Sequence, residues 1–176
     1  CSDEEAINLS RNRKNIEQNN TVLATAKIST IETISNKILT YKLFNRLGIA
    51  VPDFKVCKNR NELMQYSSTF YKNRGSFVIK DAVARGNRGT VLVDKTISGK
   101  KDYMGSRELH MDWEYFNNKF NEFIDDVFPK LITERLYEPC YDIDVLAKNG
   151  KVIHAIPRER INPAGVPYHG NIMRGN

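Results

Sequence analysis

The residues whose types and spacing could do chemistry lie between positions 77 and 94, where the sequence reads FVIKDAVARGNRGTVLVD. Lys80 ends an apolar run, a loop with two glycines and two arginines follows, and a second apolar run comes directly after the loop. Glycines accept the unusual dihedrals with which successive backbone N–H groups form an anion-binding nest. A lysine that closes an apolar strand is costly to bury without an anionic partner. Together these features predict a phosphate cradle.

Two common phosphate cradles do not fit this segment. A P-loop needs GxxxxGK[ST] and a dinucleotide fold needs GxGxxG, each followed by a helix. Here the glycines are Gly86 and Gly89, and the β-branched, alternating run TVLVD predicts a strand after them. We therefore expect a glycine-rich flap that joins two antiparallel strands and closes over a nucleotide, with Arg85 and Arg88 adding charge at its rim. Taken alone, the segment is also consistent with an ordinary hairpin whose lysine and arginines are solvated.

The distribution of charge favours an anionic ligand near this loop. The chain of 176 residues has a formal net charge of +6. Residues 72–110 include nine basic residues and four acidic residues. The basic residues are Lys72, Arg74, Lys80, Arg85, Arg88, Lys95, Lys100, Lys101 and Arg107. Most of the excess positive charge thus surrounds the predicted cradle.

Cysteine and histidine usage argues against several other kinds of site. Cys1, Cys57 and Cys140 form no CxxC pair, and the three histidines are scattered. This argues against a zinc site and against a disulfide-stapled secreted domain. No signal-peptide pattern and no run of about eighteen apolar residues is present, so we expect a cytoplasmic protein without a membrane span. The start at Cys1 rather than Met leads us to expect a fragment of a longer protein.

Hydrophobic periodicity predicts the elements before the loop. We expect a polar surface helix over 3–18, a short buried strand over 21–26, and a helix that begins near Asn36 and ends at Gly48. The apolar face of that helix is expected at Leu39, Leu43 and Leu47. An extended segment over 53–57 and an amphipathic helix beginning within 59–73 complete this half.

The loop is expected between strands 76–80 and 90–94, with Val78 and Lys80 on one face of the first strand and Phe77 and Ile79 on the other. Residues 95–111 read as a mobile surface loop, because they are polar and contain Gly99 and Gly105. Beyond them we expect a helix over 112–127, a strand within KLITERLY, a break near Pro139, and a strand pair closed by Asn149–Gly150.

Three segments occur in the order and approximate spacing of the ATP-grasp superfamily: SNKILTYKLFNRLGIAVPDF, FVIKDAVARGNRGTVLV and LITERLYEPCYDIDVLAKNGKVI. The chain most resembles the large subunit of carbamoyl-phosphate synthase and its stand-alone relatives. The resemblance implies an α+β chain with part of an ATP-grasp fold, in which an antiparallel-sheet lobe carries the flap. It divides the chain into the end of a Rossmann-like domain (1–30), linker helices and the start of the core (31–75), the nucleotide-binding lobe (76–137) and the truncated start of the C-terminal lobe (138–176).

The resemblance assigns the phosphate contacts. Lys37, in the first turn of the first-motif helix, and Lys80 match the two lysines that contact ATP phosphates. The usual aspartate before the first lysine is Asn36 here, which still permits helix capping. The flap that covers the β- and γ-phosphates matches Arg85, Gly86, Asn87, Arg88, Gly89 and Thr90.

The resemblance also assigns the nucleoside contacts. Adenine recognition falls to the backbone of a hinge that matches Glu134, Arg135, Leu136 and Tyr137. Without the family, the hinge residues read equally well as a strand edge. The glutamate that commonly binds the ribose hydroxyls is replaced by Cys140, so that Glu138 or Asp142 is left as its substitute.

Arg158 and Arg160 resemble the basic residues that the family directs at the transferred phosphate or the acyl-phosphate, and they are equally consistent with a surface-exposed strand pair. The RINP run at 160–163 resembles the metal motif, but arginine stands in the glutamate position and cannot ligate magnesium. The magnesium ligands are therefore expected outside this chain.

The implied activity is that of an ATP-dependent carboxylate–amine ligase with ATP and Mg²⁺ as cofactors. ATP would activate a small-molecule carboxylate, or bicarbonate, as an acyl-phosphate that an amine attacks. We expect residues 1–176 alone to be inactive. We expect no nucleic-acid or membrane partner, and the formation of a homo-oligomer remains open. The alternatives are a non-catalytic ATP-grasp module and, less favoured, a basic nucleic-acid-binding domain. Against the latter, no aromatic pair sits on adjacent strands in the manner of RNA-binding sheets.

Overall fold

The structure, a computed structural model, describes residues 3–18, 20–84, 88–103, 108–137, 139–160 and 171–172. Its centre is a six-stranded sheet in the order β1-β6-β2-β3-β5-β4. The strands are β1 (Phe54–Cys57), β2 (Ser76–Asp81), β3 (Thr90–Asp94), β4 (Lys100–Tyr103), β5 (Glu108–Met111) and β6 (Lys130–Thr133). Since β3 and β5 run parallel, the sheet is mixed, and the expectation of an antiparallel-sheet lobe is wrong for this pair of strands. The α+β class is confirmed.

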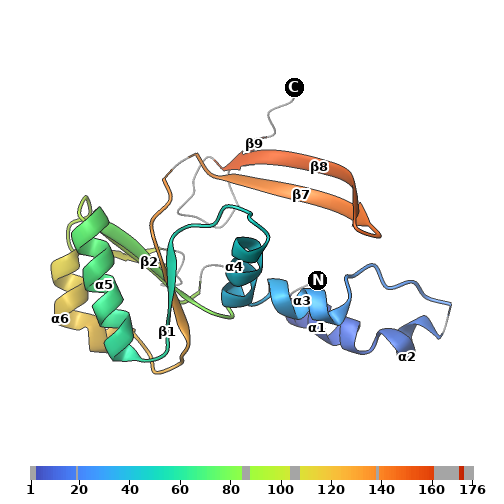
Figure 1. Ribbon diagram of the computed structural model, residues 1–176, viewed down its shortest axis with the longest axis horizontal. Coiled ribbons are helices and arrows are strands. Elements are labelled where there is room, and N and C mark those ends of the chain that lie inside the picture. Colours follow the sequence, from blue (N-terminus) through green and yellow to red (C-terminus); the bar gives the residue numbers. More distant parts are fainter. Residues whose placement is uncertain are drawn as a thin grey trace.

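Two helices, α5 (Arg60–Arg74) and α6 (Trp113–Phe123), cover one face of this sheet (Figure 1). Phe77 and Ile79 point into this layer and are almost fully buried, and the rings of Phe77 and Phe116 meet edge to face with centroids 5.2 Å apart. The predicted alternation along β2 is confirmed, because Val78 and Lys80 lie on the opposite face and border a cavity. That face carries the candidate site.

The ends of α5 and α6 follow from single capping residues. The side chain of Asn59 accepts a hydrogen bond from Glu62 N, and that of Asp112 accepts one from Tyr115 N. Gly75 ends α5 with φ = 73°, a left-handed conformation that glycine adopts without strain. Helix α6 ends at Phe123, four residues before the predicted limit.

Four helices precede the sheet: α1 (Asp3–Arg11), α2 (Arg13–Glu17), α3 (Ile28–Ile34) and α4 (Lys37–Arg46). The start and end of α4 are confirmed, because Asn36 caps Ile38 N and Leu39 N and Gly48 follows with φ = 71°. The predicted apolar face is wrong, since Leu39 and Leu47 are exposed and Ile38 is buried. Helix α4 meets the sheet through its first turn, where Lys37 N donates to Ala82 O (2.8 Å).

The buried strand expected over 21–26 is absent from the structure, in which this segment is irregular and Val22 is 87% exposed. Side chains of the first helices take the place of a neighbouring strand. Ser10 donates to Ala26 O (2.8 Å), and Arg13 donates to Leu23 O (3.1 Å). These contacts satisfy carbonyl groups that a strand would have paired in a sheet.

The surface loop expected over 95–111 is also wrong in part, because this segment supplies β4 and β5. β5 pairs in parallel with β3 from Thr90–Glu108 to Val93–Met111, and β4 pairs antiparallel with β5. Together they extend the sheet past β3 and place Glu108 and His110 on the face opposite α5 and α6.

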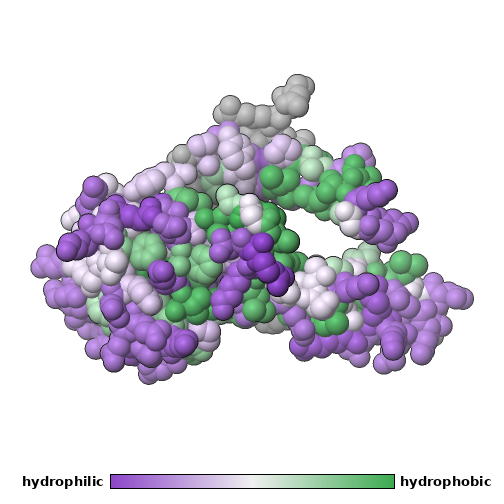
Figure 2. All heavy atoms as spheres, viewed as in Figure 1, coloured by the Kyte–Doolittle hydropathy of each residue, from purple (hydrophilic) through white to green (hydrophobic). Residues whose placement is uncertain are grey.

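A separate three-stranded sheet contains β7 (Tyr141–Lys148), β8 (Lys151–Arg160) and β9 (Asn171–Ile172). The hairpin at Asn149–Gly150 is confirmed, with φ of 52° and 75° at the two turn residues. This hairpin extends over the amino-terminal helices and exposes large apolar side chains, including Ile143 and Val152 (Figures 1 and 2). In the described parts of the chain, no helix has both the length and the apolar character needed to cross a membrane.

Candidate functional site

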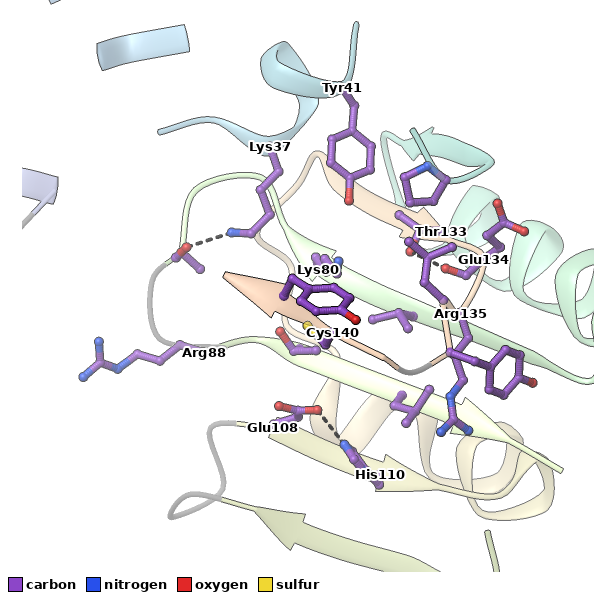
Figure 3. Close-up of a pocket in the computed structure, with 18 of the residues that line it drawn as sticks. Lys37, Tyr41, Lys80, Arg88, Glu108, His110, Thr133, Glu134, Arg135 and Cys140 are labelled. Atoms are coloured by element: carbon purple, nitrogen blue, oxygen red, sulfur yellow. Dashed lines mark hydrogen bonds and ion pairs between the residues drawn. The ribbon is translucent and has the colours of Figure 1, made fainter. Parts of the chain in front are cut away.

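The candidate site is a cavity of about 690 Å³ on the sheet face opposite α5 and α6. Its walls are α4, strands β2, β3 and β5, the segment 134–137 after β6, and the start of β7 (Figure 3). This volume lies within the range that small-molecule and cofactor sites usually have. The cavity brings together segments that are far apart in the sequence.

The floor of the cavity is built from alternate residues of neighbouring strands. Val78 on β2 pairs with Leu92 on β3, and Leu92 pairs with His110 on β5. Thr90 pairs with Glu108 in the same way. Because side chains two apart in a strand share a face, Lys80 joins this set.

Lys80 brings a cation to the cavity. Burial lowers the pKa of the Lys80 amine, and the carboxylate of Glu108 acts in the opposite direction. Among the described residues, no side chain or carbonyl accepts a hydrogen bond from the Lys80 ammonium. Lys80 is thus a half-buried cation directed at a space large enough for a ligand.

Lys37 brings a second cation and ties α4 to the start of the predicted flap. Its backbone N donates to Ala82 O (2.8 Å), and its Nζ donates to Ala84 O (2.7 Å). Lys37 therefore faces the cavity from the side opposite the sheet, as Figure 3 shows. The position of its ammonium depends on the backbone that leaves β2.

Of the predicted flap, Arg85, Gly86 and Asn87 lie outside the described residues. Thr90 lines the cavity, and so does Arg88, although its guanidinium is directed away from the sheet (Figure 3).

Gly89 anchors the far end of the loop. It has φ = 70°, and a Cβ there would lie 1.9 Å from Asp81 Oδ2. Asp81 is in turn held by Lys130 Nζ at 2.5 Å. This position therefore requires glycine for both its backbone conformation and its space.

Two of the predicted hinge side chains, Glu134 and Arg135, have structural partners. Glu134 accepts from Asp53 N (2.8 Å) and pairs with Arg74 (2.5 Å). Arg135 pairs with buried Asp94 at 2.5 Å. These ion pairs fix the chain where it leaves β6.

Leu136 and Tyr137 line the cavity and are about two-thirds exposed. Tyr137 packs under the Arg135 guanidinium, 4.8 Å from its ring centroid. No backbone–backbone hydrogen bond among the described residues uses the amide or carbonyl groups of 135–137. Those groups are therefore available to a ligand.

The remaining predicted residues are divided between the cavity and the hairpin. Cys140 lines the cavity, whereas Asp142 and Arg158 do not. Arg158 pairs with Asp144, with Nε 2.9 Å from Oδ2. Glu138 and the side chain of Arg160 lie outside the described residues.

The lining residues that sequence reasoning missed include Tyr41, Glu108, His110 and Thr133. Glu108 and His110 form a pair on β5 with Oε1 and Nε2 2.6 Å apart, and both side chains are 11% exposed. The alternation Glu-Leu-His-Met over 108–111 was the available signal. The rings of Tyr41 and Phe54 meet edge to face, and burial raises the pKa of the Tyr41 hydroxyl.

Metal ligands and relatives do not identify the site. The described ranges contain no group of three or more His, Cys, Asp or Glu side chains that could hold a metal ion. No protein-family model and no curated protein matches the chain. The evidence for the function of the cavity is therefore the chemistry of its own residues.

Proposed function

We propose that this chain is the ATP-binding part of an ATP-grasp ligase that resembles the large subunit of carbamoyl-phosphate synthase. In this proposal, ATP activates a carboxylate or bicarbonate as an acyl-phosphate, which an amine then attacks. The observation that carries it is the meeting of Lys37 and Lys80, 43 positions apart in the sequence, at one cavity beneath a strand–loop–strand unit.

The charges around the cavity favour a phosphorylated ligand. Lys37, Lys80 and Arg88 are lining cations, whereas Arg135 is already paired with Asp94. Amines and guanidinium groups in a half-enclosed site bind phosphate oxygens by charge-assisted hydrogen bonds. A triphosphate is a better match for several such cations than a singly charged ligand.

The apolar part of the cavity suits a base. Val78 and Leu92 lie side by side on the sheet, and Pro52 and Leu136 line the wall next to the hinge segment. An aromatic base between these side chains would reach the backbone groups of 135–137 with its edge. The phosphates would then extend along β2 toward Lys80 and the flap.

In the proposed reaction, the protein's own groups position the triphosphate and neutralise its charge. Lys80 and Lys37 would hold phosphate oxygens, and the flap would exclude water from an acyl-phosphate. Magnesium would neutralise further charge. The described residues form no site for it, so no step is assigned to the metal here.

A nucleotide series tests the proposal. We expect calorimetric titration of the chain to give affinities that fall from ATP to ADP to AMP, by roughly tenfold or more for each phosphate lost, because each phosphate makes charge-assisted contacts. Equal affinity for ATP and adenosine, or no binding of either, would contradict it. Salt-dependent binding to random DNA without ATP binding would favour the nucleic-acid alternative.

A non-catalytic ATP-grasp module is the second candidate function. The observation that favours it is the pairing of Arg158 with Asp144 away from the cavity. Phosphate release from ATP distinguishes the ligase from the non-catalytic module. It is measured with the full-length protein in the presence of a panel of carboxylates. Binding without carboxylate-dependent release would support the non-catalytic module.

A further inference from the structure

The Glu108–His110 pair lines the cavity but has no part in the function proposed above. It lies on β5, within a segment that was expected to be a loop. Glu108 and Glu134 are the carboxylates among the described lining residues, and Glu134 is held by Arg74 and Asp53 N. A carboxylate on the floor of a phosphate-binding cavity would repel the ligand, so its presence calls for a physical reason.

The strand register places Glu108 in one row with Lys80. Thr90 pairs with Glu108, and Lys80 follows the last paired residue of β2, Ile79, which lies opposite Val91. Lys80, Thr90 and Glu108 thus occupy successive positions across β2, β3 and β5, on the cavity face. Two strand spacings are about 10 Å, a gap that a lysine and a glutamate can narrow by leaning toward each other.

The position of Glu108 in this row affects the protonation of Lys80. Burial favours the neutral amine of Lys80, which cannot attract phosphate, while Glu108 favours the ammonium. His110 contacts the Glu108 carboxylate at 2.6 Å and so restrains it on the floor of the cavity.

Other charged or titratable groups line the same cavity as Lys80. From α4 these are Lys37 and Tyr41, and from the flap Arg88. From the segment after β6 and the start of β7 they are Glu134, Arg135, Tyr137, Cys140 and Tyr141. Lys37 and Arg88 are cations and would disfavour the charged form of Lys80. The Glu134 carboxylate is paired with Arg74, so Glu108 is the carboxylate that favours the ammonium.

We propose that Glu108 is a positioning residue for Lys80: its carboxylate, restrained by His110, keeps the Lys80 amine protonated and ready to bind phosphate. That the ligand of Lys80 is a phosphate rests on the proposed function. The effect of Glu108 on the protonation of Lys80 does not depend on it. A Glu108→Gln change then has two opposite effects. Lys80 loses its proton at a lower pH, and near neutral pH the repulsion of the phosphates is relieved.

The coupling is measured without a nucleotide by ¹³C NMR titration of the lysine Cε signals, with the Lys80 signal assigned by its loss in Lys80→Arg. The expected result is a Lys80 midpoint that falls in Glu108→Gln and stays unchanged in Glu114→Gln, a matched change at an exposed residue of α6. An unchanged midpoint in Glu108→Gln overturns the proposal. Should that variant fail to fold, Glu108→Asp takes its place, with the same direction expected.

Calorimetry with ATP tests the consequence for binding. When the pH is raised from about 7 to about 9.5, the affinity for ATP should fall in both proteins, because only the ammonium of Lys80 attracts phosphate. We expect this fall to be larger in Glu108→Gln than in the unmodified chain, by about threefold or more. Equal weakening at every pH would mean that Glu108 has only a structural role, and would overturn the inference. If the unmodified chain binds no ATP, the proposed function fails, while the NMR titration still decides the coupling.

Discussion

At the scale of single residues, Gly89 is a position at which the structure does not accommodate a side chain. Its positive φ disfavours other residues, and a Cβ would clash with the carboxylate of Asp81. Gly99 has a similar φ of 67° but open space around it. The two glycines therefore separate backbone strain from the steric contact.

We predict that Gly89→Ala lowers the free energy of unfolding by about 2–4 kcal/mol, and Gly99→Ala by about 1 kcal/mol. Denaturant titration of both variants measures the difference. Equal losses would show that the Asp81 carboxylate moves away at no cost, and that the loop is not anchored at Gly89.

Asp94 is a second residue whose effect on stability can be measured. Burial alone would raise the pKa of its carboxyl, but hydrogen bonds from Thr96 and the Arg135 guanidinium lower it below 3.8. A carboxyl with a lowered pKa stabilises the fold above its unfolded pKa and loses this contribution as the pH falls through its folded pKa.

We predict that the free energy of unfolding falls as the pH drops below about 4, and that Asp94→Asn flattens this fall while lowering stability at neutral pH. Asp126→Asn is the control, because that carboxylate is 84% exposed and its pair with Arg60 is screened by solvent. Urea titrations at several pH values measure both variants. The same acid slope in Asp94→Asn and the unmodified chain would contradict the role assigned to Asp94.

At the scale of elements, the sequence predicted those whose signals are local. The turn residues Asn149–Gly150, the caps Asn36 and Gly48, and the alternation of Phe77, Val78 and Ile79 each act within a few positions. Lys80 could be selected as a site residue from its place at the end of an apolar strand, whereas Lys37 was selected through the resemblance of its helix to the first ATP-grasp motif.

The elements that were not predicted from the sequence depend on contacts with residues distant in the chain. β5 is four residues long, and its parallel pairing with β3 comes from a segment 18 positions earlier, from Thr90 to Glu108. Segment 21–26 has the composition of a strand but bonds to Ser10 and Arg13 instead. The lining residues Glu108 and His110 were missed because the strand that carries them was missed.

At the scale of the whole molecule, the cavity joins helix α4, the large sheet and the segment that follows β6. A ligand that contacts all three should stabilise them together, since binding to the folded state adds RT ln(1 + [L]/Kd), about 2.7 kcal/mol at a hundredfold excess over Kd. The contacts come from α4, β2, β3, β5 and the segment 134–137.

We predict that ATP slows amide hydrogen exchange in those five segments at once and leaves α1 and α2 unchanged, because no residue of α1 or α2 that the structure describes lines the cavity. Mass-spectrometric exchange with and without ATP measures this. Protection confined to the basic surface around Lys72 and Lys95 would instead indicate diffuse charge attraction.

The proposed binding of ATP depends above all on Lys80 as the cation that contacts the triphosphate. The most direct test is calorimetric titration of ATP into the unmodified chain, Lys80→Met and Lys72→Met, the last removing an equal charge from an exposed position of α5. We predict that Lys80→Met weakens ATP binding by at least about tenfold, the worth of one hydrogen bond to a charged group, and that Lys72→Met changes it little. Equal ATP affinities in all three proteins would contradict the account.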